Sequence, residues 1–175
     1  KYLGLMKRNL AAALQDEAQQ AINDYLVADP KELKDRWNFN PKYEKYPDYL
    51  QKAAELLGES HFFYKTLLAR LHYFRGLNYR LKAEREQSDS LLQLAISEQE
   101  KGLMLEPKSA HMFNELGWIS YLQKKPSKSI EYYQKALVYA PNWALLLSNM
   151  CASHNENGQF QEAISAGNQA IKCDS

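Results

Sequence analysis

Cys151 and His154 lie three residues apart near the end of the sequence, and Glu156 follows two residues later. On a helix, residues three apart share one face, so this pair could present two metal ligands. A structural zinc site needs four ligands and a catalytic site three, and no Cys-x-x-Cys pair accompanies these residues. We therefore expect no metal and no cofactor, and we interpret Cys151 as a small apolar residue at a helix contact.

The other residues that could catalyse a reaction are scattered. His61, His72 and His111 have no carboxylate at a spacing that would orient a catalytic base. The seven glycines are isolated from one another, so the sequence contains neither a phosphate-binding loop nor a dinucleotide-binding turn. We expect this chain to be non-catalytic, although a catalytic domain could lie elsewhere in a longer protein.

Charge is distributed in two opposite stretches. Residues 59–85 carry an excess of four cations, and residues 86–107 an excess of four anions. The cations recur about every five residues, which advances them about 140° around a helix and spreads them over several faces. This pattern favours solvated or internally paired charges, and the alternative is a surface for an acidic ligand or RNA.

Composition is that of an ordinary globular domain. The 175 residues are 45% hydrophobic and carry a net charge of +1, so no overall field attracts nucleic acid or anionic lipid. No apolar run reaches the length of about 20 residues that a membrane helix requires, so no membrane association is expected. Two cysteines and the lack of an Asn-x-Ser/Thr sequence favour a reducing, cytoplasmic location.

The elements that must position these residues are helical. Pro107 and Pro141 lie 34 residues apart, and a third interval of this length would end at Ser175. Within each of these two intervals apolar residues recur at helical spacing, and turn residues occur at 125–127 and 157–158. Each interval therefore predicts two helices joined by a short turn, which makes the chain all-α.

Gly117, the run 130–137 and Pro141 resemble the tetratricopeptide repeat, and the second interval matches through Gly158 and Phe160. The resemblance is clearest over 108–175, with units at 108–143 and 144–175, the second truncated. It implies a solenoid of helical hairpins, a right-handed superhelix with a concave groove. Four positions depart from the usual repeat residues: Ser120, Ser129, Cys151 and His154.

Upstream, the resemblance degenerates. Residues 59–107 predict one stretched hairpin with helices at 61–86 and 89–105, the second capped by Ser88 or Asp89. Residues 1–58 form an irregular helical segment with longer helices. Within it, residues 2–28 predict one long helix or a tight hairpin, 37–48 an ordered loop rich in aromatics and proline, and 48–57 a short helix ending at Gly58.

The resemblance also implies which residues line the groove. In the first unit these are His111, Asn114, Trp118, Tyr121 and Leu122; in the second they are Leu145, Ser148, Ala152, Asn155 and Glu156, with Asn149 beside them. The helical wheel agrees, because Trp118 and Tyr121 fall off the apolar stripe of their helix. An exposed Trp next to a Tyr is typical of a binding hot spot. The alternative is that Trp118 packs on the preceding helix.

We therefore predict a protein-interaction scaffold that binds a peptide or a neighbouring domain, within a larger multidomain protein. The resemblance does not extend to the heat-shock chaperone clamp, because only Asn149 fits that pattern of Lys and Asn. Two alternatives stay open: an RNA-binding helical-repeat module, and the sensor or docking arm of an enzyme. Nucleic acid is not the expected partner, because a basic groove with repeated base-reading positions is missing.

Overall fold

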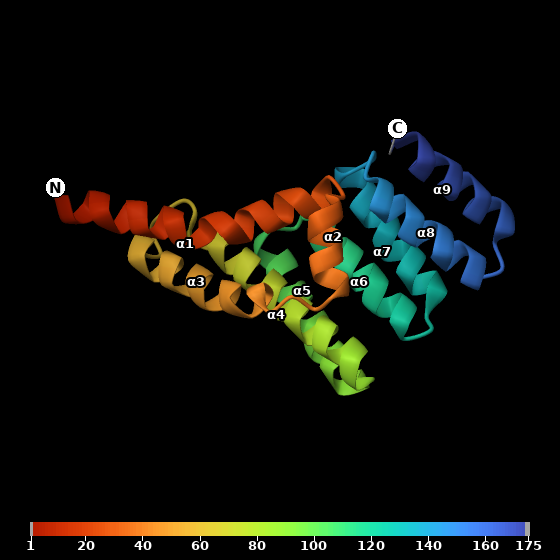
Figure 1. Ribbon diagram of the computed structural model, residues 1–175, viewed down its shortest axis with the longest axis horizontal. Coiled ribbons are helices and arrows are strands. Elements are labelled where there is room, and N and C mark those ends of the chain that lie inside the picture. Colours follow the sequence, from red (N-terminus) through yellow and green to blue (C-terminus); the bar gives the residue numbers. More distant parts are fainter. Residues whose placement is uncertain (1, 174–175) are drawn as a thin grey trace. The chain divides into compact units, whose positions relative to one another are not determined.

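The computed structural model describes residues 2–173, which form nine α-helices and contain no β-strand (Figure 1). The helices are α1 (Tyr2–Leu26), α2 (Pro30–Trp37), α3 (Lys42–Leu57), α4 (Tyr64–Glu86), α5 (Asp89–Leu105), α6 (Ala110–Leu122), α7 (Pro126–Tyr139), α8 (Ala144–Glu156) and α9 (Phe160–Cys173). The all-α prediction is confirmed. Lys1 and Ser175, the outer limits of the predicted segments, lie outside the described residues.

Contacts divide the chain into two units. Unit 1 consists of Lys1–Asn23 and Lys34–Pro107, and unit 2 consists of Asp24–Leu33 and Lys108–Ser175. The divisions fall inside α1 and α2. A short N-terminal segment therefore packs with the C-terminal repeats.

In unit 1, α4 and α5 form the long hairpin that the sequence predicts, starting three residues later than expected at its first helix. Gln87 ends α4 in the left-handed conformation with φ 51°, and Ser88 Oγ accepts a hydrogen bond from Leu91 N at 3.4 Å. Ser88 is thus the N-cap of α5. The two helices approach closely at Gly76, where an added Cβ would lie 2.5 Å from Gln99 Nε2.

The prediction for residues 37–57 is wrong in its boundaries. The helix α2 continues to Trp37 and α3 begins at Lys42, so the predicted loop over 37–48 shrinks to residues 38–41, and Pro47 lies inside α3. Proline lacks the N–H that would donate to the carbonyl four residues before it, here that of Tyr43. Asn78 of α4 donates to this carbonyl instead, with Nδ2 2.9 Å from Tyr43 O. A tertiary hydrogen bond therefore replaces the missing helical one.

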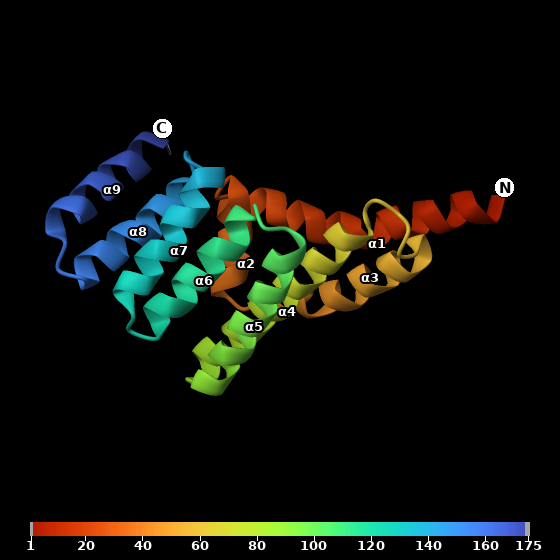
Figure 2. The same ribbon diagram turned by 180° about the vertical axis from the view of Figure 1, so that it is seen from behind.

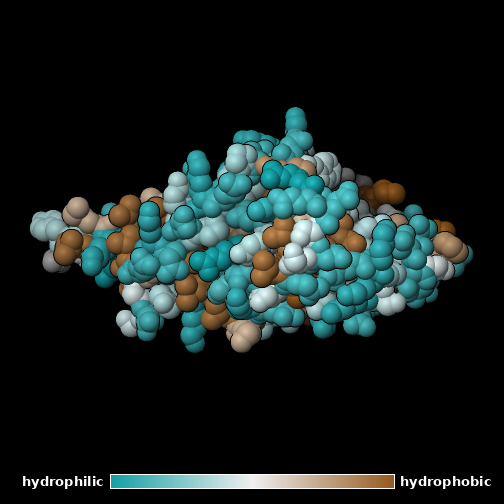
Figure 3. All heavy atoms as spheres, turned by 90° about the horizontal axis from the view of Figure 1, so that it is seen from below, coloured by the Kyte–Doolittle hydropathy of each residue, from teal (hydrophilic) through white to brown (hydrophobic). Residues whose placement is uncertain are grey.

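The N-terminal residues form one long helix, α1, rather than a hairpin. Its first turns expose large side chains, namely Tyr2, Leu3, Leu5, Met6 and Leu10. Hydrophobic spheres are visible at this end of the molecule, on the left of Figure 3. At the other end Ala28 has φ 54°, and Asp29 Oδ1 accepts from the N–H groups of Lys31 and Glu32 at 2.9 Å. Asp29 therefore caps α2. Among the described helices, none combines the length and apolarity that crossing a bilayer requires.

Unit 1 contains a charged cluster that predicts a pH dependence of stability. Glu98 Oε2 lies 2.8 Å from His72 Nδ1, and Glu98 Oε1 lies 2.5 Å from Lys101 Nζ. Burial raises the pKa of Glu98, but hydrogen bonds and charge from Lys101 and His72 outweigh burial and lower it below its ordinary value. A carboxylate with a lowered pKa stabilises the fold above its unfolded pKa, and this stabilisation is lost as pH falls through the folded pKa.

We therefore expect Glu98→Gln to lower the urea midpoint at pH 7, and the gap from the wild type to close below about pH 4. Urea titrations at pH 7 and pH 3 measure both effects. Glu100→Gln, at an exposed position of the same helix, is the matched control and should change neither midpoint. A gap that is equally large at both pH values would contradict the role assigned to the Glu98 charge.

Unit 2 contains two helical hairpins, α6 with α7 and α8 with α9, and α8 lies between α7 and α9 (Figure 2). The second turn occurs where the sequence predicts it, with Gly158 at φ 74° before α9. The first lies two residues earlier than the predicted 125–127, because Lys124 has φ 59° and Pro126 already opens α7. Proline suits the first helical position, because its missing N–H would have no partner there. Ser129 Oγ donates to Gly117 O at 2.8 Å and contacts Ser153 Oγ at 2.9 Å, so small hydroxyl residues join three helices.

The two hairpins differ at one helix contact. In the first, the ring of Tyr133 fills the space above Gly117, where any Cβ would overlap Tyr133 Cε1. In the second, the residues 34 positions later are Cys151 and Gly167, and a Cβ on Gly167 would lie 3.4 Å from Cys151 Sγ. With no ring to fill it, this part of α9 borders an open pocket of about 470 Å³.

Candidate partner-binding surface

The predicted groove residues lie on α6 and α8, which are neighbours in unit 2. Their exposure divides them into three groups. His111 and Asn114 are buried; Trp118, Tyr121, Leu122, Leu145, Asn149 and Ala152 are half-buried; Ser148, Asn155 and Glu156 are exposed. We call these residues the α6–α8 face. One end of this face is covered and the other is accessible.

The covered end is held together by asparagine side chains. Asn149 Nδ2 of α8 donates to Asn114 Oδ1 of α6 at 3.1 Å. Asn114 Nδ2 in turn donates to the hydroxyl oxygen of Tyr25, at 2.7 Å. Asn114 is fully buried and Tyr25 is only 5% exposed, so these hydrogen bonds lie away from solvent. The chain therefore occupies this end of the face with its own residue from α1.

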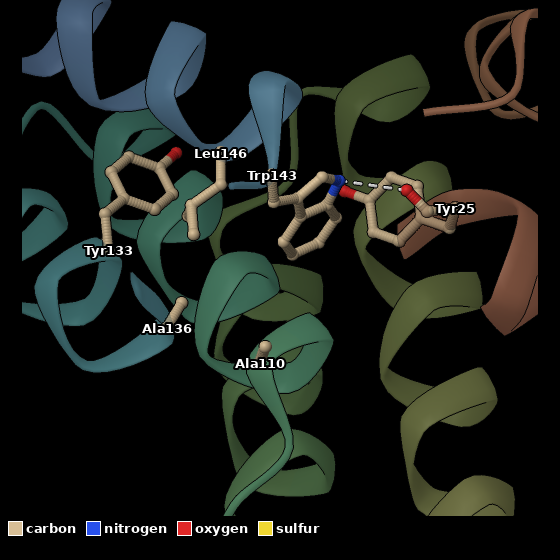
Figure 4. Packing of buried hydrophobic residues seen from close by; sticks show 6 residues of the cluster. All are labelled: Tyr25, Ala110, Tyr133, Ala136, Trp143 and Leu146. Carbon is tan, nitrogen blue, oxygen red and sulfur yellow. Dashed lines mark hydrogen bonds between the residues drawn. The ribbon is translucent and has the colours of Figure 1, made fainter. Parts of the chain in front are cut away.

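Trp143 completes the contact with Tyr25 (Figure 4). The two rings meet edge to face with centroids 5.0 Å apart, and Trp143 Nε1 donates to the carbonyl oxygen of Tyr25 at 3.0 Å. Figure 4 shows Trp143 between Leu146 and Tyr25. These side chains belong to a buried cluster of Tyr25, Ala110, Tyr133, Ala136, Trp143 and Leu146, against which Leu26, Leu33 and Leu145 also pack.

The roles of Tyr25 and Trp143 do not follow from the sequence. They are separated by 118 residues, so no local spacing relates them. The one available signal is the pair of aromatic residues next to the helix breaks at Asp29-Pro30 and Pro141. That signal marks helix ends and says nothing about which ends meet.

The accessible end carries an aromatic pair. Trp118 and Tyr121 stack with ring centroids 5.3 Å apart and an interplanar angle of 18°. Lys124 Nζ lies 5.9 Å from the centroid of the Tyr121 ring and 3.8 Å from Glu156 Oε1. Residues three apart on a helix are neighbours, so α6 alone orients the two rings. The pair presents a flat aromatic surface bordered by one cation and one anion.

The structure gives no support to the metal interpretation of Cys151 and His154. His154 is buried, and its Nδ1 lies 2.9 Å from Gln159 Oε1, within hydrogen-bond distance. Across residues 2–173, no group of three or more His, Cys, Asp or Glu residues is placed to hold a metal ion. Cys151 lies beside Gly167 of α9, a helix contact of the kind that its position in the sequence predicts.

Several cations of α4 take part in contacts within unit 1. Arg70 Nη1 donates to Gln15 Oε1 of α1 at 3.0 Å. Arg80 is buried and pairs with Glu84 at 3.1 Å, and Lys82 lies 3.9 Å from Glu86. These contacts agree with the internally paired interpretation of the charge pattern.

Stacked antiparallel helix pairs with small residues at their crossings define a helical-hairpin repeat protein. Residues 110–143, which contain α6 and α7, match the tetratricopeptide repeat family. The chain therefore contains a tetratricopeptide repeat, and the predicted resemblance is confirmed. Such repeats act as scaffolds for protein interactions, which is the general function indicated for this chain.

Solved structures support the fold over nearly the whole chain. A crystal structure of MamA is 19% identical, with a TM-score of 0.54 over 93% of this chain and 92% of that chain. The thermophilic tetratricopeptide protein TTC0263 of Thermus thermophilus is 18% identical, with a TM-score of 0.51 over 97% and 90% of the two chains. No curated protein sequence is significantly similar to this chain. At these identities the similarity shows the solenoid fold alone.

Proposed function

We propose that this chain binds a peptide or a segment of another protein at the accessible end of the α6–α8 face. The observation that carries the proposal is the stacked pair of Trp118 and Tyr121, which lies at the ligand positions implied by the repeat and is half-buried. Large rigid rings bury much area at a small cost in side-chain entropy, which suits them to binding. Leu122 and Ala152 extend the apolar part of this surface.

The charges around this surface indicate the kind of ligand. Lys124 and Glu156 lie near each other, so the rim offers one cation and one anion instead of a cationic pocket. Asn149, the residue that fits the chaperone-clamp pattern, donates to Asn114. These features favour a ligand that is recognised by apolar and aromatic contacts, with neither a terminal carboxylate nor a phosphate as the main determinant.

We expect Trp118→Ala to weaken ligand binding about 30-fold, as truncating a hot-spot aromatic does. The free energy of unfolding should change by less than about 1 kcal/mol, because Trp118 is half-buried. Peptides selected from a displayed random library on the wild-type chain provide the ligands, and isothermal titration provides their affinities. Urea unfolding of both proteins measures stability.

Tyr132→Ala is the control for this test, because Tyr132 is a half-buried aromatic on α7, outside the α6–α8 face. It should leave the affinities unchanged. If the selected peptides bind the Trp118 variant as tightly as the wild type, the binding surface lies elsewhere. Single-stranded RNA is titrated in parallel, and binding that weakens steeply with salt would favour the nucleic-acid alternative.

A further inference from the structure

Within unit 2, the segment Asp24–Leu33 packs on the C-terminal repeats, residues 108–175, as a ligand would. Its residues come from the last turn of α1 and the first turn of α2, joined by a tight turn in which Ala28 has φ 54°. Two hydrogen bonds close this turn, Ala28 N to Tyr25 O at 3.1 Å and Asp29 N to Asp24 O at 2.9 Å. The segment therefore has a local structure of its own, from which Tyr25, Leu26 and Leu33 project into the cluster of unit 2.

Recognition of this segment is polar as well as apolar. Asn114 donates to the Tyr25 hydroxyl and Trp143 donates to the Tyr25 carbonyl, while Asn149 orients Asn114. A hydroxyl and a carbonyl on the same residue are both recognised, and the ring between them meets Trp143 edge to face. An empty site would leave the buried side chain of Asn114 without this partner, which is costly unless another hydroxyl replaces it. The hydroxyl contact is the one that matches a tyrosine side chain.

The position of this contact connects it with ligand binding. Asn114, His111 and Leu145 occupy positions that, in the resembling family, line the ligand groove, yet here they are covered or packed by the chain itself. We propose that the covered end of the α6–α8 face is a tyrosine-binding site that residues 24–33 fill as an exchangeable internal ligand. A partner protein with an exposed tyrosine at a helix end would compete for it. This inference rests on the proposed function, because it concerns the same face.

The test uses the full chain and a fluorescein-labelled peptide of residues 20–33, with anisotropy as the measurement. The Tyr25→Ala chain, whose own segment lacks the ring, should bind this peptide. The wild-type chain and the Tyr132→Ala control should bind it at least about tenfold more weakly, because a tethered segment competes at high effective concentration. A peptide carrying Tyr25→Phe should bind the Tyr25→Ala chain about tenfold more weakly, because Asn114 Nδ2 then lacks the hydroxyl oxygen that accepts its hydrogen bond.

Two results would overturn the proposal: equal binding of the peptide to the wild-type and Tyr25→Ala chains, or no binding to a Tyr25→Ala chain that circular dichroism shows to be folded. If Tyr25→Ala does not fold, amide hydrogen exchange of the Tyr25→Phe chain decides. Faster exchange confined to residues 24–33 would show that the segment is released by itself and supports the proposal. Equal acceleration in α6 and α8 would show that the segment is permanent core.

The proposed function and this inference can fail separately. The peptide of residues 20–33 contacts the end of the face that contains Asn114, so adding Trp118→Ala to the Tyr25→Ala chain should change its affinity by less than about twofold. The library-selected peptides should be weakened by Trp118→Ala in either background. If Trp118→Ala does not weaken the library-selected peptides, the surface assigned to the proposed function is wrong. The tyrosine-binding site would still be supported by binding of the 20–33 peptide.

Discussion

Gly117→Leu should lower the free energy of unfolding by about 3 kcal/mol or more, because the side chain would enter space already filled by a buried ring. A Cβ at this position would overlap Tyr133 Cε1 and lie 2.5 Å from Cδ1. Tyr133 is fully buried, so its ring cannot swing into solvent without leaving the cluster of unit 2. Relief would have to come from separating α6 and α7.

Urea unfolding followed by circular dichroism measures this effect. Gly4→Leu is the matched control, because Gly4 is also helical but has no atom within 4 Å of an added Cβ. Leucine has the higher helix propensity, so the control should be neutral or slightly stabilising. An unfolding midpoint for Gly117→Leu equal to that of the wild type would show that α6 and α7 do not pack closely at Gly117.

Trp143→Ala should cost about 4 kcal/mol of stability, within the range for truncating a buried aromatic residue. Trp143 is 3% exposed, and its loss would also leave the carbonyl of Tyr25 without its indole donor. The cavity would open between Tyr25 and Leu146, which come from helices far apart in the sequence. We therefore expect this substitution to be among the most destabilising in unit 2.

The control for Trp143 is Trp37→Ala, because Trp37 is 71% exposed at the end of α2. Its free energy of unfolding should lie within about 0.5 kcal/mol of the wild type, as is usual for surface substitutions. The same urea titration compares both variants. Equal effects of the two tryptophan substitutions would contradict the central position of Trp143 in the buried cluster.

Comparison of the two C-terminal hairpins shows how a repeat can vary without losing its fold. The pair of Gly117 and Tyr133 is replaced 34 residues later by Cys151 and Gly167, which moves the larger side chain from one helix to the other. Both arrangements keep a small residue at the crossing, so both permit close helix packing. The second arrangement fills less volume, which agrees with the open pocket beside Gly167.

The helices that the sequence predicts well are those whose signals are local. The bounds of α5 and the turn before α7 follow from Ser88 and Pro126, whose capping preferences act within a few residues. The α3 prediction is wrong because Pro47 is a local helix breaker, and the hydrogen bond that compensates for it comes from Asn78, 35 residues away from Tyr43. A local rule cannot include a distant donor.

In the candidate site, too, the sequence predicts the local features and misses those that depend on distant residues. Trp118 and Tyr121 stack as neighbours on one helix, and the helical wheel alone separates them from the apolar stripe. The sequence also places Asn114 on the ligand face, but it does not predict that this residue is buried. The reason is that its burial depends on Tyr25, which lies 89 residues before it.

The sequence by itself determined the helical class, the 34-residue period and the residues that α6 and α8 can direct to one face, because helix periodicity, caps and breakers are properties of neighbouring residues. Only the tertiary structure decided that residues 24–33 belong with the C-terminal repeats, and that Tyr25 covers one end of the α6–α8 face. The packing of residues 24–33 depends on hydrogen bonds between buried polar groups that are far apart in the sequence, and local residue spacing cannot predict such pairs.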